Sequence, residues 1–226
     1  MKSIIIYGAT GMLGQGVLRE SLLDTHIERV TLIGRTPIGQ THPKLREIVH
    51  ADLFDYHNIE EQLIGIDACF FCLGTPSTGK TEAEYTRITK DLTLTAAQVL
   101  LRLNPQLAFI YISGEGADSS EKGALMWARV RGQTENELLR MPFKRVYIVR
   151  PGVIQPLNGI QSRVLLYRLG YSVLKPMLPM LRYFFPNLIS STQLLGQAMI
   201  KIAREGYEKP ILRNKDLYLL SLSKQE

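Results

Sequence analysis

Three evenly spaced glycines near the start of the chain could hold a phosphate. Gly8, Gly11 and Gly14 form a G-x-x-G-x-x-G pattern directly after the apolar run Ser3–Tyr7. In such a junction the first glycine allows a tight turn, the second lets the backbone approach a pyrophosphate, and the third lets helix and strand pack closely. The helix N-terminus then favours the anion; the alternative is a glycine turn without a ligand. The candidate cofactor contacts in this turn are Gly8, Thr10, Gly11, Met12, Leu13 and Gly14.

The end of the second predicted strand, Ile33-Gly34-Arg35-Thr36, bears on which dinucleotide would bind. A protein that binds NAD carries Asp or Glu here, where the carboxylate bonds the ribose 2′-hydroxyl. Arg35 takes that place, and an arginine favours a 2′-phosphate. We therefore predict NADP(H) in preference to NAD(H); the alternative is that Arg35 is a solvated loop residue. Asp52 and Leu53, after the third predicted strand, are candidates for flanking the adenine.

A second phosphate motif lies further along the chain. Residues 74–81, GTPSTGKT, match G-x-x-x-x-G-K-[ST] in full, between a predicted strand and a predicted helix, which is the context a P-loop needs. No later predicted strand ends in an aspartate suited to Mg²⁺, and the motif follows a separate dinucleotide turn. A P-loop NTPase is therefore the least favoured interpretation, although Lys80 could still meet a cofactor phosphate or an anionic substrate.

These motifs depend on strands and helices that alternate along the chain up to residue 150. The predicted strands are continuous apolar runs at 3–7, 29–33, 46–50, 66–73, 107–112 and 145–149, and the predicted helices span 11–23, 56–64, 82–103 and 125–140. Strands without polar alternation, separated by helices, indicate a parallel sheet covered on both faces. Right-handed crossovers then give a doubly wound α/β sheet of the Rossmann type. After Pro151 we expect an amphipathic helix over 192–203, with Thr192 as its N-cap, and a last strand over 211–220.

Composition bounds the class of protein and its compartment. The 226 residues are 45% hydrophobic and 21% charged, which excludes a disordered or collagen-like chain. Residues 1–150 carry 17 basic and 17 acidic side chains, so the whole net charge of +6 lies in 151–226. Cys69 and Cys72 fall on a predicted strand, where positions three apart face opposite ways, so we expect buried thiols and not a redox pair. The N-terminus shows no export signal, which predicts a reducing cytoplasm, and the four histidines show no metal-ligand spacing.

Six motifs occur together over most of the chain: GATGMLG at 8–14, IGRTP at 33–37, ADLFD at 51–55, FCLGTP at 71–76, YISGEGAD at 111–118 and VRPGVI at 149–154. In this order they resemble the short-chain dehydrogenase/reductase superfamily, in particular its atypical branch of NmrA-like and HIV-Tat-interacting-protein-like oxidoreductases. The resemblance implies a Rossmann domain that binds NADP(H), with a substrate cleft formed by the C-terminal part. It places Cys72, Leu73 and Gly74 beside the cofactor. It also places Pro151 and Gly152, with the arginine before them, near the nicotinamide end.

The same superfamily works with a Tyr-x-x-x-Lys pair on a helix and a serine at the end of the fifth strand. Ser113 matches the serine, but the pair here is Trp127 and Arg131. An indole N–H takes no part in acid–base chemistry near neutral pH, whereas the arginine stays charged and can bond ribose hydroxyls. Ser113 and Arg131 are thus the candidate catalytic residues, and Trp127 is interpreted as a core or cleft-wall aromatic. Three other acids could replace the missing tyrosine: Tyr85, Glu115 and Tyr167.

The segment 160–186 is rich in Leu, Tyr, Phe and Pro, and it carries basic residues at 168, 175 and 182. Its prolines and charges argue against a transmembrane helix. Three interpretations stay open: the segment walls an apolar substrate cleft, pairs subunits as a homodimer, or makes peripheral contact with an anionic membrane surface. No stacking platform accompanies the basic residues, so nucleic acid is not predicted as a partner.

One domain, residues 1–226, is the simplest organisation, with residues 151–210 forming most of a helical lobe on the substrate side. The predicted function is that of an NADP(H)-binding oxidoreductase that acts on a small carbonyl-type substrate, apolar or anionic, with the proton supplied by water or an unidentified group. The alternative is a non-catalytic NADP(H)-sensing or binding protein, which the tryptophan at position 127 favours.

Overall fold

The computed structural model describes residues 1–160, 180 and 188–222 of the 226-residue chain. Most of the segment 160–186 therefore lies outside the described residues, as does Tyr167, so the three interpretations of that segment stay predictions. In the part of the chain that is described, no helix combines the length and the hydropathy needed to cross a membrane.

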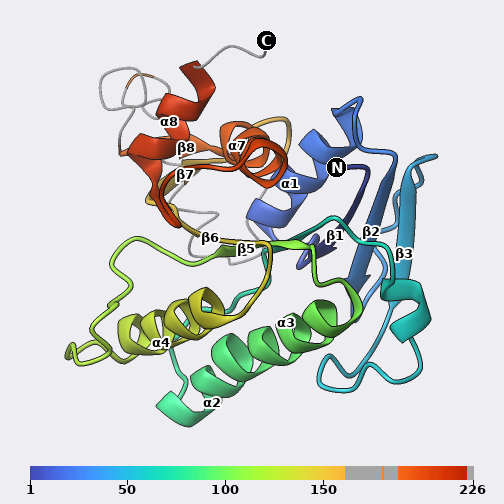
Figure 1. The fold of residues 1–226 in the computed structure, drawn as a ribbon. Helices are drawn as coiled ribbons and strands as arrows, with labels where there is room; N and C mark the ends of the chain where they lie inside the picture. The colour runs from blue at the N-terminus through green and yellow to red at the C-terminus, as the bar shows by residue number, and fades with distance from the viewer. Residues whose placement is uncertain (161–179, 181–187, 223–226) are drawn as a thin grey trace.

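The centre of the molecule is a seven-stranded parallel sheet in the order β3-β2-β1-β4-β5-β6-β9 (Figure 1). Its strands are β1 (Ser3–Tyr7), β2 (Arg29–Gly34), β3 (Leu45–Val49), β4 (Ala68–Phe71), β5 (Ala108–Ile112), β6 (Arg145–Arg150) and β9 (Ile211–Arg213). Every residue of β1, β4 and β5 is buried, because helices cover both faces of the sheet. This confirms the predicted doubly wound α/β fold.

Helices lie on both sides of the sheet (Figure 1). One layer contains α1 (Met12–Leu23), α7 (Thr192–Glu205) and α8 (Asn214–Leu222), and the other contains α2 (Glu82–Thr86), α3 (Leu92–Leu103) and α4 (Met126–Arg140). Two glycines let α1 and α7 approach closely. A carbon added to Gly16 would lie 2.7 Å from the Thr192 carbonyl oxygen, and one added to Gly196 would lie 3.0 Å from the Gly16 carbonyl oxygen. Helix α7, which belongs to the predicted lobe 151–210, thus covers the sheet beside α1. That residues 151–210 form a lobe on the substrate side stays a prediction.

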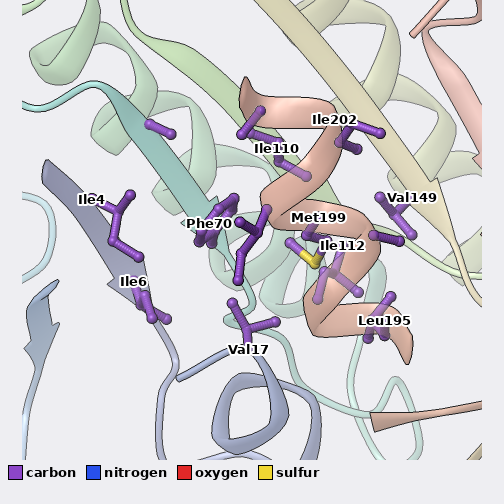
Figure 2. Close-up of a cluster of buried hydrophobic side chains, with 14 of the residues drawn as sticks. Ile4, Ile6, Val17, Phe70, Ile110, Ile112, Val149, Leu195, Met199 and Ile202 are labelled. Atoms are coloured by element: carbon purple, nitrogen blue, oxygen red, sulfur yellow. The ribbon is translucent and has the colours of Figure 1, made fainter. Parts of the chain in front are cut away.

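The two helix layers pack against the sheet through two clusters of buried apolar side chains. Ile4 and Ile6 point into one cluster with residues of α1 and α7, and Ile5 points into the other with residues of α3 and α4, since successive side chains of a strand face opposite ways. Figure 2 shows the first cluster, in which Ile4, Ile6, Val17, Phe70, Ile110, Ile112, Val149, Leu195, Met199 and Ile202 are labelled. Cys69 lies in the second cluster and Cys72 packs against the first, so they face opposite sides of the sheet, as the strand periodicity predicts. Both are free thiols, but Cys72 is only half-buried, so the predicted burial is confirmed for Cys69 alone.

The predicted helix at 56–64 is wrong, because only a single 3₁₀ turn forms there, Glu60–Leu63. The Asp55 carboxylate accepts the His57 backbone N–H at 3.0 Å, which makes a local turn where the helix was expected to begin. Gly65, with φ +74°, ends the segment in the left-handed region. The apolar spacing that suggested a helix here comes from side chains that enter the core from a turn.

The predicted helix at 82–103 forms, but a π-helical turn at Arg87–Asp91 separates α2 from α3. Its start is fixed by a capping box: the Thr81 hydroxyl accepts the Glu84 N–H at 3.3 Å, and the Glu84 carboxylate accepts the Thr81 N–H at 2.8 Å. Apolar periodicity does not distinguish one wider turn within a longer helix, so the sequence gives no sign of it.

The predicted end of the chain needs two corrections. Ser191, not Thr192, caps α7, since its hydroxyl accepts the Leu194 N–H at 3.1 Å. The last strand stops at Arg213, whose N–H is bonded by the Asp216 carboxylate at 2.9 Å, and α8 follows. A separate parallel pair, β7 (Val153–Gln155) with β8 (Ile189–Ser191), was not predicted, because strands of three residues are too short to show a period.

Candidate functional site

A cleft of about 1050 Å³ opens at the carboxyl edge of the sheet, where β1 lies between β2 and β4. In doubly wound sheets this reversal of strand order is where ligands bind. Most of the predicted site residues line this one cleft: Gly8, Thr10, Gly11, Met12, Leu13, Arg35, Asp52, Leu53, Cys72, Leu73, Gly74, Ser113 and Arg131. Three predicted residues, Gly14, Pro151 and Gly152, are not part of its lining.

The three glycines of the first turn differ in why a side chain is excluded. Gly8 has φ +76°, and a carbon added to it would lie 2.7 Å from the Leu73 backbone. A carbon on Gly14 would lie 2.8 Å from the Gly8 carbonyl carbon, so this glycine lets α1 pack on the turn. Gly11 has ordinary extended backbone, and a carbon there would meet only the Gly8 oxygen, at 3.4 Å, before entering the cleft. No side chain caps α1 at Gly11, which leaves its first N–H groups for an anion.

The residues that follow β2 and β3 form one end of the cleft. Arg35 is exposed there, and nothing in the described part of the chain pairs with its guanidinium. Asp52 accepts the Phe54 N–H at 2.9 Å, which fixes the loop after β3. Glu47 also lines the cleft and was missed by sequence reasoning; its carboxylate accepts the Ile38 N–H at 2.7 Å. Only the pairing of β3 with β2 brings Glu47 here, so no local pattern signals it.

The P-loop-like segment 74–81 does not form a phosphate cradle. Gly74 and the two residues after it line the cleft, but Lys80 is not among the lining residues. In a P-loop the hydroxyl of the final threonine binds Mg²⁺. Here the Thr81 hydroxyl is engaged by Glu84 instead, donating to its carboxylate at 2.8 Å and accepting its N–H. The geometry therefore agrees with the sequence argument against an NTPase.

Ser113 and Arg131 together form what we call the polar corner of the cleft. Ser113 directly follows β5, is only 5% exposed, and its Oγ has no hydrogen-bond partner. Arg131 reaches the corner from α4, where its Nε donates to the Tyr85 hydroxyl at 3.1 Å and its buried Nη1 has no partner. A carbon on Gly114 would lie 3.7 Å from Nη1, and one on Gly74 would lie 3.9 Å from Nη2, so the guanidinium sits between the ends of β4 and β5.

The charge of Arg131 persists despite its burial. Burial lowers the pKa of the guanidinium, but the neighbouring Tyr111 and Tyr85 raise that pKa above its ordinary value overall. The sequence indicates Tyr85 only as a candidate acid and does not predict which residues lie beside it. The structure gives it a definite place, since it is buried and bonded to Arg131.

Trp127, at the position of the superfamily's tyrosine, lies outside the lining of the cleft. Its half-buried ring packs on Gly116, where an added carbon would lie 3.1 Å from the ring edge. Trp127 therefore lies neither in the core nor in the wall of this cleft, and it packs on the loop after β5 instead. Glu115, another candidate acid, forms an ion pair with Arg213 at 3.3 Å and is also absent from the lining.

Arg150 points into the protein and away from the cleft. Its Nε contacts both carboxylate oxygens of Glu135, at 3.0 and 3.1 Å, and its Nη2 donates to the Ser119 hydroxyl at 2.6 Å. Arginine and glutamate are both buried, so this pair joins α4, β6 and the loop after β5. The next residues, Pro151 and Gly152, turn toward β7, and the Gly152 N–H is bonded by the Asn214 side chain at 3.3 Å. Their predicted place near the nicotinamide stays a prediction.

The two thiols are expected to react slowly with alkylating agents in the native protein. Burial raises the pKa of both Cys69 and Cys72 well above the ordinary value, so the reactive thiolate is scarce at neutral pH. We expect iodoacetamide at pH 7.5 to modify the native chain at least ~10-fold more slowly than the urea-unfolded chain. Mass spectrometry of both time courses measures this, and equal rates would contradict the assigned burial.

Among the described residues no group of three His, Cys, Asp or Glu side chains could hold a metal ion.

A parallel sheet in this order, with a glycine turn and a cleft at its reversal point, defines a Rossmann-type α/β protein. The model of the NAD dependent epimerase/dehydratase family matches residues 4–122, more than half of the chain, and the chain belongs to this family. The matches also support the resemblance of the sequence motifs to the atypical short-chain dehydrogenase/reductase branch.

Similar proteins agree with this assignment. The chain is 28% identical over 224 residues to leucinostatins biosynthesis cluster protein T of Purpureocillium lilacinum, covering 86% of this chain and 82% of that protein. It is 30% identical over 156 residues to protein HTATIP2 of Rattus norvegicus, covering 68% and 63%. It is 24% identical over 209 residues to the mitochondrial protein FMP52-1 of Scheffersomyces stipitis, covering 92% and 90%. Among solved structures, UDP-glucose 4-epimerase of Thermotoga maritima shares the fold, with a TM-score of 0.69, 12% identity, and coverage of 97% and 81%.

Proposed function

We propose that this protein binds NADP(H) and acts as an oxidoreductase on a small carbonyl-type substrate. One observation carries the proposal: at Gly11 the backbone of the β1–α1 turn faces the cleft with no side chain and no cap on the helix N-terminus. This is the opening that the diphosphate of a dinucleotide needs. The family defines the nucleotide as a nicotinamide one, and the finer choice of NADP(H) rests on Arg35.

The cleft provides a place for each part of the cofactor. The turn Gly8–Leu13 would hold the pyrophosphate, Arg35 the 2′-phosphate, and Asp52 with Leu53 the adenine. Residues 72–74 would lie along the middle of the cofactor, and Arg131 would bond a ribose hydroxyl. Bound NADPH supplies hydride, and Ser113 would donate a hydrogen bond to an oxygen of the substrate. No proton donor stands at Trp127, so water would supply the proton.

Calorimetry on the purified protein with NADP(H), NAD(H) and ATP tests the proposal. We expect micromolar binding of NADPH, weaker binding of NADH, and no Mg²⁺-dependent binding of ATP. The proposal would be overturned if neither NADP(H) nor NAD(H) bound. Tight ATP binding that is lost in Lys80→Ala would restore the P-loop interpretation.

Replacing Arg35 with aspartate is expected to weaken NADPH binding by about 10- to 100-fold, the loss of one charge-assisted hydrogen bond to a phosphate. NADH affinity should hold or improve, because a carboxylate at this place bonds the 2′-hydroxyl. Arg46→Asp is the matched control, since Arg46 is an exposed arginine on β3 outside the cleft lining. The measurement is the ratio of NADPH to NADH dissociation constants. An unchanged ratio in Arg35→Asp would remove Arg35 from the site.

A non-catalytic NADP(H)-binding or sensing protein is the second candidate. The observation that favours it is the packing of Trp127 on Gly116, which leaves no group that transfers protons at the position of the superfamily's tyrosine. Steady-state assays with aldehydes, ketones and quinones separate the two candidates. NADPH binding without substrate-dependent oxidation would favour the sensor. The cytoplasmic location also stays a prediction, since the names of several relatives carry the word mitochondrial.

A further inference from the structure

We propose that the polar corner is the binding site for a carboxylate group of the substrate, held by Nη1 of Arg131 and Oγ of Ser113, with Tyr85 as the residue that positions the guanidinium. This inference deepens the proposed function by naming the class of substrate, a small carboxylic acid. It rests on the proposed function for the cofactor that shares the cleft.

Two buried hydrogen-bonding groups of the corner lack partners. Ser113 Oγ and Arg131 Nη1 are both inaccessible to solvent, and neither bonds to the protein. Buried polar groups without partners are rare in native proteins and need an explanation, of which a missing ligand is one. Both groups can donate, and they belong to residues that line the same cleft. A ligand that fits them presents acceptor oxygens.

The charge of the corner specifies the ligand further. Within the described residues, Arg131 forms no ion pair. The buried carboxylate of Glu135 helps to raise the pKa of Arg131, but it is in contact with Arg150, and Glu115 is in contact with Arg213. A buried guanidinium without a counter-charge in direct contact is unfavourable, and an anionic ligand relieves it. A neutral carbonyl would satisfy the two donors but would leave this charge uncompensated.

The guanidinium offers one nitrogen to each side of the cleft. Nη2 lies toward Gly74, at the end of β4, and Nη1 lies toward Gly114, directly after Ser113. Nη2 therefore remains for the cofactor ribose, while Nη1 serves the substrate side. Tyr85 accepts the Nε–H at 3.1 Å, and this bond fixes the plane of the guanidinium between the two strands. A lysine has a single ammonium nitrogen, so it could not place one nitrogen on each side of the cleft.

Pairs of acids and their uncharged amides test the proposal directly. The probes are acetate with acetamide and benzoate with benzamide, titrated by ligand-observed NMR into the protein saturated with NADPH and, separately, into the free protein. We expect each acid to bind at least 10-fold more tightly than its amide in both titrations, because the amide lacks the charge and replaces one acceptor oxygen by an NH2 donor. The free-protein titration keeps the test valid even if NADPH does not bind, so failure of the proposed function and failure of this inference give different results.

Variants assign the preference to the corner. Ser113→Ala and Arg131→Lys should each weaken the acid by about 10-fold or more, the loss of one hydrogen bond to a charged group, while amide binding changes little. Tyr85→Phe keeps the buried ring and removes the Nε contact, so the ratio of acid to amide affinity should fall several-fold, and urea denaturation checks that the variant stays folded. Arg129→Lys is the matched control on the same helix. Arg129 bonds Glu82 at 2.7 Å and lies outside the cleft lining.

Three outcomes would overturn the inference. Equal affinity for acid and amide would show that charge is not recognised. An acid preference retained in Arg131→Lys and Ser113→Ala would place the carboxylate elsewhere. Acid binding that disappears when the protein is saturated with NADPH would show that the cofactor itself takes Nη1.

Discussion

Replacing Gly11 with valine is expected to abolish useful dinucleotide binding, raising the dissociation constant of NADPH by at least ~100-fold through the loss of charge-assisted bonds to the pyrophosphate. The reason is steric and local. The Gly11 backbone lies at φ −79° and ψ 161°, which valine adopts freely, and an added carbon meets only the Gly8 oxygen, at 3.4 Å. The rest of the side chain enters the cleft, where the diphosphate would lie. The free energy of unfolding should therefore stay within about 1 kcal/mol of the parent.

Gly14→Ala is the matched control for Gly11→Val, because both glycines belong to one turn. A carbon on Gly14 would lie 2.8 Å from the Gly8 carbonyl carbon, so α1 must move away from the turn. Such overpacking costs about 1–3 kcal/mol of stability. Calorimetry for NADPH and urea denaturation, applied to both variants, separate a binding role from a packing role. Unchanged NADPH affinity in Gly11→Val would discredit the assignment of this turn to the cofactor.

The sequence predicts those parts of the molecule whose cause is local. The glycine turn could be found because its three glycines, Gly8, Gly11 and Gly14, fall within seven residues directly after a strand, although the close approach of Gly8 to the Leu73 backbone is a distant contact. The central strands could be found because burial on both faces leaves few polar side chains in them. Arg35 and Ser113 could be placed because each ends a strand, and parallel strands end at one edge. Thirteen predicted residues therefore line a single cleft, although 105 positions separate Gly8 from Ser113.

Contacts between distant segments could not be predicted. Tyr85 and Arg131 are 46 residues apart, and only the packing of α2 on α4 brings them together. Glu47 enters the cleft through the pairing of two strands. The helix that follows Arg213 is set by one hydrogen bond to Asp216, where apolar content alone indicated a strand. In each case the deciding interaction is a tertiary contact or a single hydrogen bond, and neither produces a periodic pattern of apolar residues in the sequence.

The buried pair of Glu135 and Arg150 is expected to give the largest loss of stability of any single polar contact. In Glu135→Leu the guanidinium keeps only its bond to the Ser119 hydroxyl and is left buried without a counter-charge. Breaking a buried pair in this way costs about 3–5 kcal/mol, out of the 5–15 kcal/mol typical of a whole domain. Urea denaturation with linear extrapolation measures the change. A loss below about 1 kcal/mol would mean that the pair is not buried as described.

The double variant Glu135→Leu with Arg150→Met should recover most of that loss, since replacing both partners by apolar side chains removes the uncompensated charge. Glu137→Leu, two residues along α4, is the surface control: its pair with Arg140 spans 3.5 Å and is exposed, so its loss should stay below about 1 kcal/mol. The pair also joins α4, which carries Arg131, to the loop that begins at Ser113. Amide hydrogen exchange in that loop should therefore quicken in the single variant and return toward the parent in the double, because the geometry of the polar corner depends on this contact.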